Sequence, residues 1–361
     1  MKTPKILLVG GDFGENPRKS GVVEKIAATR EINYFNGGTI EDLKKIDLKP
    51  YDVILWMPNI SNDEEKYYPK KPLGSVLIVT KVLRDENSEL EAISRIFRMS
   101  ANAVITIDKK PKYFSFKAID ALGNCWGQSD NPKDVIQFCR WIWACYGSVE
   151  RIGSEEIQNE EEGGEYMRDS ENLNIFMAIN HRIADKAQSM GGRYFGNCST
   201  RCDKLFPSAR VRNNLILVSP RNIDKGSIFA WDMVSVEMAF FKKVKYYGNK
   251  KPSVDTPVQL MIYQNAPRIN YMIHGHYYIY GAPFTQSFYP CGDLREYKEL
   301  APIIASTYNK YTMGAINLNN HGFLLYSSNL EEMKELAEKS IFIKRSIGDE
   351  PINLGSYWGF P

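Results

Sequence analysis

The chain has 361 residues, of which 43% are hydrophobic and 25% charged, as is typical of a globular protein with room for two domains. Its 46 basic and 43 acidic residues leave a formal net charge of +3, which excludes the basic excess of a dedicated nucleic-acid-binding protein. No apolar run approaches the ~20 residues of a membrane span, and we expect no secretory signal. These properties predict a cytoplasmic protein that binds neither nucleic acid nor membrane.

The first half of the chain alternates short apolar runs with helical patterns. Strands are expected at 6–9, 32–35, 53–56, 76–79 and 103–107, and helices at 22–30, after Thr39, and at 88–99 and 135–146. This alternation predicts a Rossmann-like or flavodoxin-like parallel α/β sheet over residues 1–150, covered on both faces. The glycines at 10–14 follow neither the dinucleotide-binding pattern nor the P-loop pattern. The sequence therefore predicts no role for this domain.

A change of composition marks the domain boundary. Residues 151–170 contain six glutamates and the pair Gly163-Gly164, with few large apolar residues. Such a composition is typical of a linker, although a solvated helix face is an alternative that the two glycines disfavour. We therefore predict an acidic linker at 151–170 and a second domain at 171–361.

The second half has a different pattern. Helices are expected near 174–190 and 330–338, and strands at 215–218, 269–280 and 314–318. Strands in the middle with flanking helices favour a layered α+β domain.

Three of the four histidines fall in two short motifs, His274-Gly275-His276 and Asn320-His321-Gly322. Residues i and i+2 of a strand face the same side, roughly 7 Å apart, so that His274 and His276 can converge on one ion. A turn after an apolar strand can bring His321 to the same place. A single histidine is more often a core or surface residue, but three imidazoles with an open position are typical of a catalytic zinc site.

The six cysteines form no C-x-x-C pair. A zinc ribbon is therefore disfavoured, and reduced, buried thiols are expected.

Two further segments accompany the histidine motifs: Gly-Asn-Cys-Ser at 196–199 and Ser-Val-Asp-Thr-Pro at 253–257. Together with His274, His276 and His321 they resemble the class II aldolase and adducin-head family over roughly residues 174–340. The resemblance implies an αβα domain with a central, mainly antiparallel sheet, and a homotetramer. It also implies one divalent metal per chain, with zinc expected and manganese, cobalt or iron as alternatives.

The acid in the second segment separates branches of the family. Aldolases of the fuculose-phosphate type carry a glutamate there as a base, whereas Asp255 resembles the L-ribulose-5-phosphate 4-epimerase branch, in which the aspartate is a fourth metal ligand. An alternative is that Asp255 only caps a helix, because Asp before Thr-Pro is a good N-cap. By the same resemblance, Tyr357 is the late candidate for an acid–base residue.

The resemblance also implies an anionic substrate. Asn197 and Ser253 match family positions that hold substrate phosphate. Arg221 departs from the family's turn, and it is either a bidentate anion ligand or a surface arginine. No acid lies between Gly275 and Cys291, where the epimerases carry an acid–base aspartate.

These features predict a metal-dependent sugar-phosphate lyase or epimerase that works by retro-aldol chemistry through a metal-stabilised enediolate. A class II aldolase, a dehydratase of the same fold and a non-catalytic, adducin-like assembly module are the alternatives.

Overall fold

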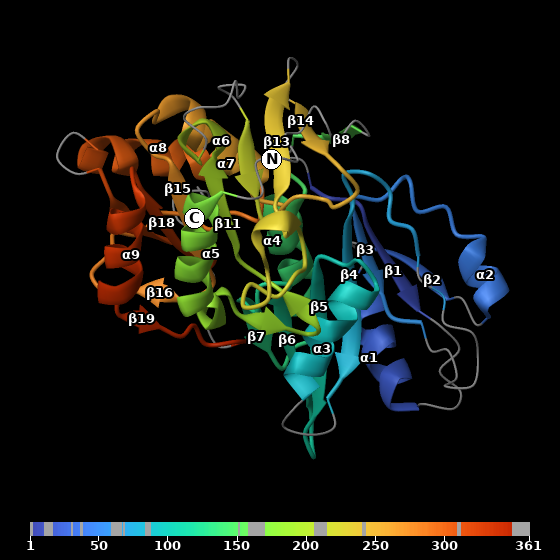
Figure 1. Cartoon of the computed structure of the whole chain (residues 1–361). Coiled ribbons are helices and arrows are strands. Elements are labelled where there is room, and N and C mark those ends of the chain that lie inside the picture. The colour runs from blue at the N-terminus through green and yellow to red at the C-terminus, as the bar shows by residue number, and fades with distance from the viewer. Residues whose placement is uncertain are drawn as a thin grey trace. The chain divides into compact units, whose positions relative to one another are not determined.

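A computed structural model describes residues 3–10, 17–29, 32–36, 39–58, 67, 69–83, 88–150, 152–157, 170–205, 215–239, 243–308 and 312–348. The chain forms two compact units (Figure 1). The first unit holds residues up to Ser148 and a short segment that begins at Ser346, and the second runs from Val149 to Arg345.

Among the described residues, the first unit folds as a seven-stranded sheet in the order β2-β1-β3-β4-β5-β6-β7. Its strands are β1 (Ile6–Gly10), β2 (Asn33–Asn36), β3 (Val53–Trp56), β4 (Val76–Val82), β5 (Ala103–Lys109), β6 (Phe114–Asp120) and β7 (Cys125–Ser129). Its helices are α1 (Pro17–Ala27), α2 (Ile40–Lys44), α3 (Ser88–Arg98) and α4 (Asp134–Tyr146). Strands β1 and β3 are buried along their whole length, as expected for strands of a sheet covered on both faces.

The sheet of the first unit is mixed, and the prediction of a parallel sheet is wrong at one edge. Strands β1 to β5 pair in parallel, but β6 runs antiparallel to β5, and β7 antiparallel to β6. A short turn joins β5 to β6, in which the Lys110 N–H donates to the Tyr113 carbonyl at 2.9 Å. Without a crossover helix the strands can only pair antiparallel. A Rossmann-like or flavodoxin-like assignment stays a prediction.

The second unit is built on an eight-stranded sheet of described residues, in the order β17-β18-β15-β11-β12-β13-β14-β8. Its strands are β8 (Ser154–Ile157), β11 (Asn197–Arg201), β12 (Ile216–Val218), β13 (Val234–Ala239), β14 (Lys243–Tyr247), β15 (Tyr271–Gly275), β17 (Gly314–Leu318) and β18 (Gly322–Ser327). Two small ribbons pair β9 (Ser189–Met190) with β10 (Arg193–Tyr194), and β16 (Tyr278–Ile279) with β19 (Phe342–Ile343). Every pairing in the large sheet is antiparallel except that of β14 with β8.

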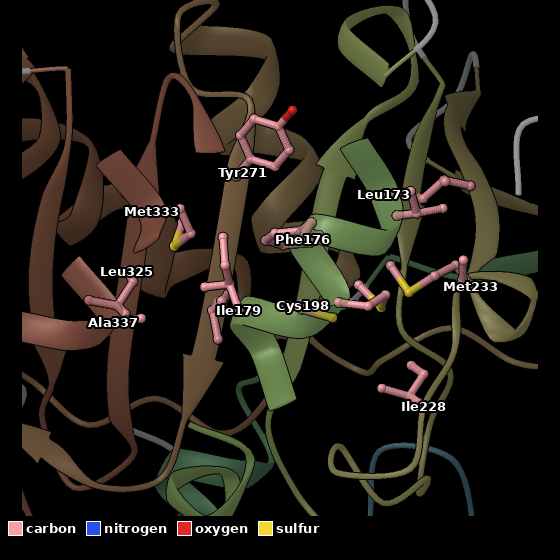
Figure 2. Packing of buried hydrophobic residues seen from close by; sticks show 14 of the residues in the cluster. Leu173, Phe176, Ile179, Cys198, Ile228, Met233, Tyr271, Leu325, Met333 and Ala337 are labelled. Carbon is pink, nitrogen blue, oxygen red and sulfur yellow. The ribbon is translucent and has the colours of Figure 1, made fainter. Parts of the chain in front are cut away.

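Helices cover both faces of this sheet. They are α5 (Glu171–Arg182), α6 (Cys202–Leu205), α7 (Thr256–Asn265), α8 (Leu294–Tyr308) and α9 (Leu330–Lys339), with short 3-10 turns η3 (Ala184–Ala187) and η4 (Ala230–Asp232). Figure 2 shows side chains of α5 and α9 in one core cluster, and side chains of α7 and α8 join a second. The pleat of β12 divides its residues between them, with Leu217 in the first cluster and Ile216 and Val218 in the second. The result is a three-layer αβα arrangement.

Two predictions for this half need correction. Part of the predicted linker is a strand, because β8 pairs in parallel with β14, and Glu156 accepts a hydrogen bond from the Tyr246 hydroxyl at 3.1 Å. Its glutamates are those of a charged edge strand; residues 158–169 lie outside the described part of the chain. The predicted strand at 269–280 is broken after Gly275, because the His276 N–H leaves the ladder and donates to the Lys186 carbonyl at 2.9 Å.

No helix in the described ranges is long and apolar enough to cross a membrane. The six cysteines all lie in these ranges, and no disulfide joins them.

Candidate metal centre

The sheet of the second unit positions the first two histidines. His274 lies on β15, which pairs with β11 on one side and with β18 on the other, opposite Asn197 and Leu324 respectively. His276 follows just beyond the end of the strand, and the ring centroids of the two histidines are 5.1 Å apart. A strand hydrogen-bonded on both sides gives the imidazoles a rigid base.

The turn between β17 and β18 positions the third histidine. Within this turn Asn320 adopts a left-handed conformation with φ of 54°, which asparagine tolerates better than most residues. Gly322 then passes so close to β15 that a Cβ atom there would lie 1.9 Å from the Gly275 carbonyl oxygen. The two His-Gly sequences therefore let the strands approach closely, and His321 turns toward the other histidines.

The three imidazoles meet in a buried cluster. The ring centroid of His321 lies 4.8 Å from that of His274 and 5.3 Å from that of His276. One nitrogen of each ring lies within 4.8 Å of a nitrogen of each of the others, and all three residues are at most 4% exposed. The spacing fits three ligands of one ion.

Hydrogen bonds orient two of the rings. His274 Nδ1 lies 2.7 Å from the Phe323 carbonyl oxygen, which turns Nε2 toward the centre. His321 Nδ1 lies 2.9 Å from Glu296 Oε1, which does the same for its Nε2. A carbonyl or carboxylate on the outer nitrogen is the usual support of a metal-binding histidine, because it fixes the tautomer and the ring orientation.

The third ring is held by stacking. The ring of His276 lies against that of Phe195, with centroids 4.7 Å apart and planes at 18°. His276 Nδ1 and His274 Nε2 are buried and accept or donate no hydrogen bond among the described residues. An unsatisfied buried polar atom costs about 1–3 kcal/mol, which a bound cation would offset.

The charge states of the histidines differ. Burial lowers the pKa of His274 to about 4, and burial together with the neighbouring His274 lowers the pKa of His276 well below its ordinary value. Burial also acts to lower the pKa of His321, but Cys291 and Glu296 outweigh it and raise that pKa well above the ordinary value. Neutral imidazole is the form that binds metal, and a dication at Nε2 would favour it in His321 as well.

Asp255 supplies a carboxylate beside the histidines. It occupies the N-cap position of α7, yet its side chain makes no capping hydrogen bond. Instead Oδ2 accepts from Asn197 Nδ2 at 3.0 Å and lies 3.9 Å from His274 Nε2. Oδ1 is buried and has no hydrogen-bond partner in the described part of the chain. The geometry therefore favours a ligand or base over a cap.

Asn197 and Ser253 lie next to this carboxylate. Asn197 Nδ2 also donates to Ser253 Oγ at 3.1 Å, and Gln259 Nε2 donates to Asn197 Oδ1. The Asn197 side chain thus holds Asp255 and Ser253 in place. A cavity of about 20 Å³, lined mostly by aliphatic side chains of α7, α8, β17 and β18, lies beside Asp255, Gln259 and His274.

Two further site residues were predicted, Arg221 and Tyr357. Arg221 lies exposed in the turn after β12, where its charge acts on Tyr246. Tyr357 lies outside the described residues. Their roles stay predictions.

Sequence reasoning missed Cys291 and Glu296. Cys291 Sγ lies 3.3 Å from His321 Nε2, and Glu296 is 3% exposed in the first turn of α8. A signal for Glu296 was present, since Leu300 and Ile304 follow at helical spacing and are buried, which places the acid on the apolar face. An isolated cysteine after a proline gives no comparable signal.

The donor set fits a divalent cation. Three imidazole nitrogens converge, and the Asp255 carboxylate lies beside one of them. Among the described residues, His274 Nε2, His276 Nδ1 and Asp255 Oδ1 are buried without a hydrogen-bond partner. Nitrogen and oxygen donors of this kind suit Zn²⁺, Mn²⁺, Fe²⁺ or Co²⁺.

Comparisons with known proteins point to the same part of the chain. Residues 176–282 match the family model of the Class II Aldolase and Adducin N-terminal domain. Among solved structures, the chain is similar to YgbL, a candidate aldolase/epimerase/decarboxylase from Escherichia coli, with 18% identity, a TM-score of 0.33, and 48% of this chain and 84% of that chain covered. An L-fuculose 1-phosphate aldolase is similar at 17% identity and a TM-score of 0.34, with 48% and 82% covered. Similarity at this level carries no conclusion about activity.

The family match lies entirely within the second unit. It includes Asn197, Ser253, Asp255, His274 and His276, and it ends before Cys291, Glu296 and His321. The resemblance predicted from the histidine and Asp-Thr-Pro motifs is therefore confirmed for this segment. Residues 176–282 are thus similar to the Class II Aldolase and Adducin N-terminal domain.

Proposed function

We propose that the second unit is a metal-dependent lyase or epimerase that breaks a carbon–carbon bond of a phosphorylated ketose, or a related anionic sugar, by retro-aldol chemistry. The observation that carries the proposal is the convergence of His274, His276 and His321, with buried ring nitrogens that have no partner among the described residues. The family match over residues 176–282 supports it. A pure assembly module has no physical need for such a cluster.

In this proposal the three histidines and Asp255 hold one ion, with zinc expected. When bound, the ion supplies Lewis-acid polarisation of a substrate oxygen. Asn197 fixes Asp255 Oδ2, which lies 3.9 Å from His274 Nε2, and Oδ1 has no hydrogen-bond partner among the described residues. The negative charge of Asp255 is thereby placed next to His274.

Asn197, Ser253 and Arg221 are proposed to bind the anionic end of the substrate, and Tyr357 to move a proton. Asn197 and Ser253 already contact each other beside Asp255, which supports a shared role for them. Arg221 is exposed and would provide a guanidinium for a phosphate or carboxylate.

Metal analysis tests the ion site. We expect about one divalent ion per chain in protein purified without chelator, and its loss in His274→Ala and His321→Ala. His181→Ala is the matched control, because His181 bonds to the Ile228 carbonyl and belongs to no donor cluster among the described residues. A wild-type protein that binds none of Zn²⁺, Mn²⁺, Fe²⁺ and Co²⁺ would contradict the proposal.

A screen of phosphorylated ketoses tests the reaction. Release of an aldehyde fragment indicates an aldolase, and inversion at one carbon without net cleavage indicates an epimerase; loss of water would instead indicate a dehydratase. If the metal-loaded protein transforms none of these substrates and an assembly role is found instead, that result supports the non-catalytic, adducin-like alternative.

A homotetramer is proposed from the family resemblance. Exposed apolar side chains on the second unit support self-association, among them Tyr280 at 73% and Ile341 at 66% exposure. Molar mass by light scattering distinguishes a tetramer from a monomer.

A further inference from the structure

The thiol of Cys291 lies next to the ring nitrogen Nε2 of His321. Cys291 Sγ lies 3.3 Å from His321 Nε2, and His321 Nδ1 is held by Glu296 on the opposite side of the ring. A bound ion and the sulfur would therefore contact the same ring nitrogen of His321, the Nε2 atom.

Two donor groups meet at this nitrogen. Donor atoms of Asp255, Cys291 and His321 lie within 4.8 Å of one another, as do those of the three histidines. His321 belongs to both groups, and Asp255 Oδ2 lies 3.9 Å from His274 Nε2, so that the two groups adjoin each other. His274 Nε2 and His276 Nδ1, each in a residue at most 4% exposed, have no hydrogen-bond partner in the described ranges.

The sulfur–nitrogen distance fits co-ligation. With metal–sulfur and metal–nitrogen bonds of about 2.3 and 2.05 Å, two neighbouring ligands of one ion lie about 3.1 to 3.6 Å apart for angles between about 90° and the tetrahedral angle. The observed 3.3 Å lies within that range, so that little movement would bring both atoms onto one ion.

The loop that carries the thiol is fixed. Gly292 has φ of 75°, and a Cβ atom there would lie 2.4 Å from the Val254 carbonyl oxygen. The Asp293 N–H closes a turn onto the Pro290 carbonyl at 3.0 Å. Only glycine permits this approach, which presses the Cys291 loop against the segment that carries Asp255.

We propose that Cys291 is a thiolate ligand of the ion, which adds sulfur to the imidazole and carboxylate donors. The inference rests on the metal centre proposed above. Ligation breaks the S–H bond, forms a sulfur–metal bond and releases the proton to solvent. Sulfur ligation selects Zn²⁺ and Co²⁺ over Mn²⁺ and Mg²⁺.

The experiment is titration of the metal-free full chain with Co²⁺, followed by absorption spectroscopy. We expect a thiolate-to-cobalt charge-transfer band in the near ultraviolet in wild type, and its absence in Cys291→Ser and Cys291→Ala, while both variants still bind cobalt through the histidines. Cys202→Ala is the control, because Cys202 lies in the apolar α5/α9 cluster, and it should keep the band. In competition titrations, Cys291→Ala should lose Zn²⁺ affinity by more than the ~10–100-fold that loss of an outer partner costs, with little change for Mn²⁺.

The outcomes separate the two proposals. Cobalt bound by wild type without a charge-transfer band would overturn the thiolate ligand and leave the histidine site standing; the sulfur would then only donate to His321. No cobalt bound at all would overturn the metal centre itself. The wild-type spectrum alone can overturn the thiolate ligand, so this outcome does not depend on how well the variants fold.

Discussion

Two acids of this chain, one in each unit, are held in opposite ways. The carboxylate of Asp120, at the end of β6, is fully buried and accepts hydrogen bonds from five donor groups. The donors are the backbone N–H groups of Leu122 and Asn124 and the side chains of Asn124, Trp126 and Tyr146. The carboxylate of Asp255 accepts from Asn197 alone among the described residues, and its Oδ1 is buried without a partner.

The difference in hydrogen bonding indicates a structural role for Asp120 and a ligand-binding role for Asp255. A buried acid whose oxygens are all satisfied ties its neighbours together and has no capacity left for a ligand. A partly buried acid that keeps one buried oxygen unsatisfied, beside imidazoles with unsatisfied nitrogens, destabilises the fold by about 1–3 kcal/mol per unsatisfied atom. Such a cost is typical of sites that bind something.

The largest expected effect is that of Asp255→Asn. The variant removes a negative charge that faces the ion, so metal affinity should fall, and turnover should drop by the ~10²–10⁴-fold typical of a lost general base or ligand. The free energy of unfolding of the metal-free protein should change little, because Asn keeps the size of the side chain. Metal content, turnover and thermal unfolding are the measurements.

The same variant distinguishes three roles of Asp255. Loss of metal indicates a ligand, and retained metal with lost turnover indicates a base. If neither metal content nor turnover changes, Asp255 is only a helix cap, for which Asn substitutes freely. The functional difference between Asp255 and Asp120 is then contradicted.

The converse variant, Asp120→Ala, should act on stability alone. Several buried donors lose their acceptor at about 1–3 kcal/mol each, so the free energy of unfolding should fall by at least about 3 kcal/mol. Metal affinity of the folded protein should stay unchanged. Asp130→Ala is the control, because Asp130 is exposed in the same unit. A variant of wild-type stability would show that this network is not structural.

Lys225 extends the comparison to a buried cation with few partners. Burial lowers its pKa from 10.5 to about 8, and its Nζ donates to the Ile223 carbonyl at 2.7 Å. Between these pKa values the unfolded chain binds a proton that the folded chain does not, so stability should rise with pH across this window, by roughly 3 kcal/mol in full. Unfolding followed from pH 7 to 10.5 should show that rise in wild type and a flatter profile in Lys225→Met.

The exposed Lys334 provides the control for this experiment. Lys334→Met should keep the wild-type pH profile. A Lys225→Met profile equal to that of wild type would mean that Lys225 is charged in the folded protein across this window.

The apolar strands of the first unit were predicted well, because β3 and the start of β4 are short runs that the sheet buries. The antiparallel strands β6 and β7 were not predicted, because nothing in the sequence before β6 distinguishes a hairpin turn from a crossover connection. Strand β8 was missed for a related reason. Its glutamates suit solvent, and only pairing with β14 makes it a strand.

The candidate site, too, was predicted from the sequence only in part. The i, i+2 spacing of His274 and His276 predicted that they converge. The position of His321 after an apolar strand predicted that it joins them. The structure adds what spacing cannot supply: the Asn197 bond that turns Asp255 away from its capping position, and the Gly292 contact that brings Cys291 to His321. Both depend on segments that meet only in the folded chain.

The smallest predicted effect comes from two glutamates of α8 that differ as Asp120 and Asp255 do. Glu299 accepts from the Gln286 and Ser287 N–H groups and the Tyr289 hydroxyl, whereas the side chain of Glu296 has His321 as its hydrogen-bond partner. Glu296→Ala should therefore lower zinc affinity by about 10–100-fold, because His321 loses the group that orients its ring. Glu296→Gln keeps an acceptor and should recover part of that loss, while Glu299→Gln should lower the melting temperature and leave zinc affinity unchanged. Competition with a chromophoric chelator measures the affinities, and equal zinc affinity in all four proteins would show that His321 needs no support from α8.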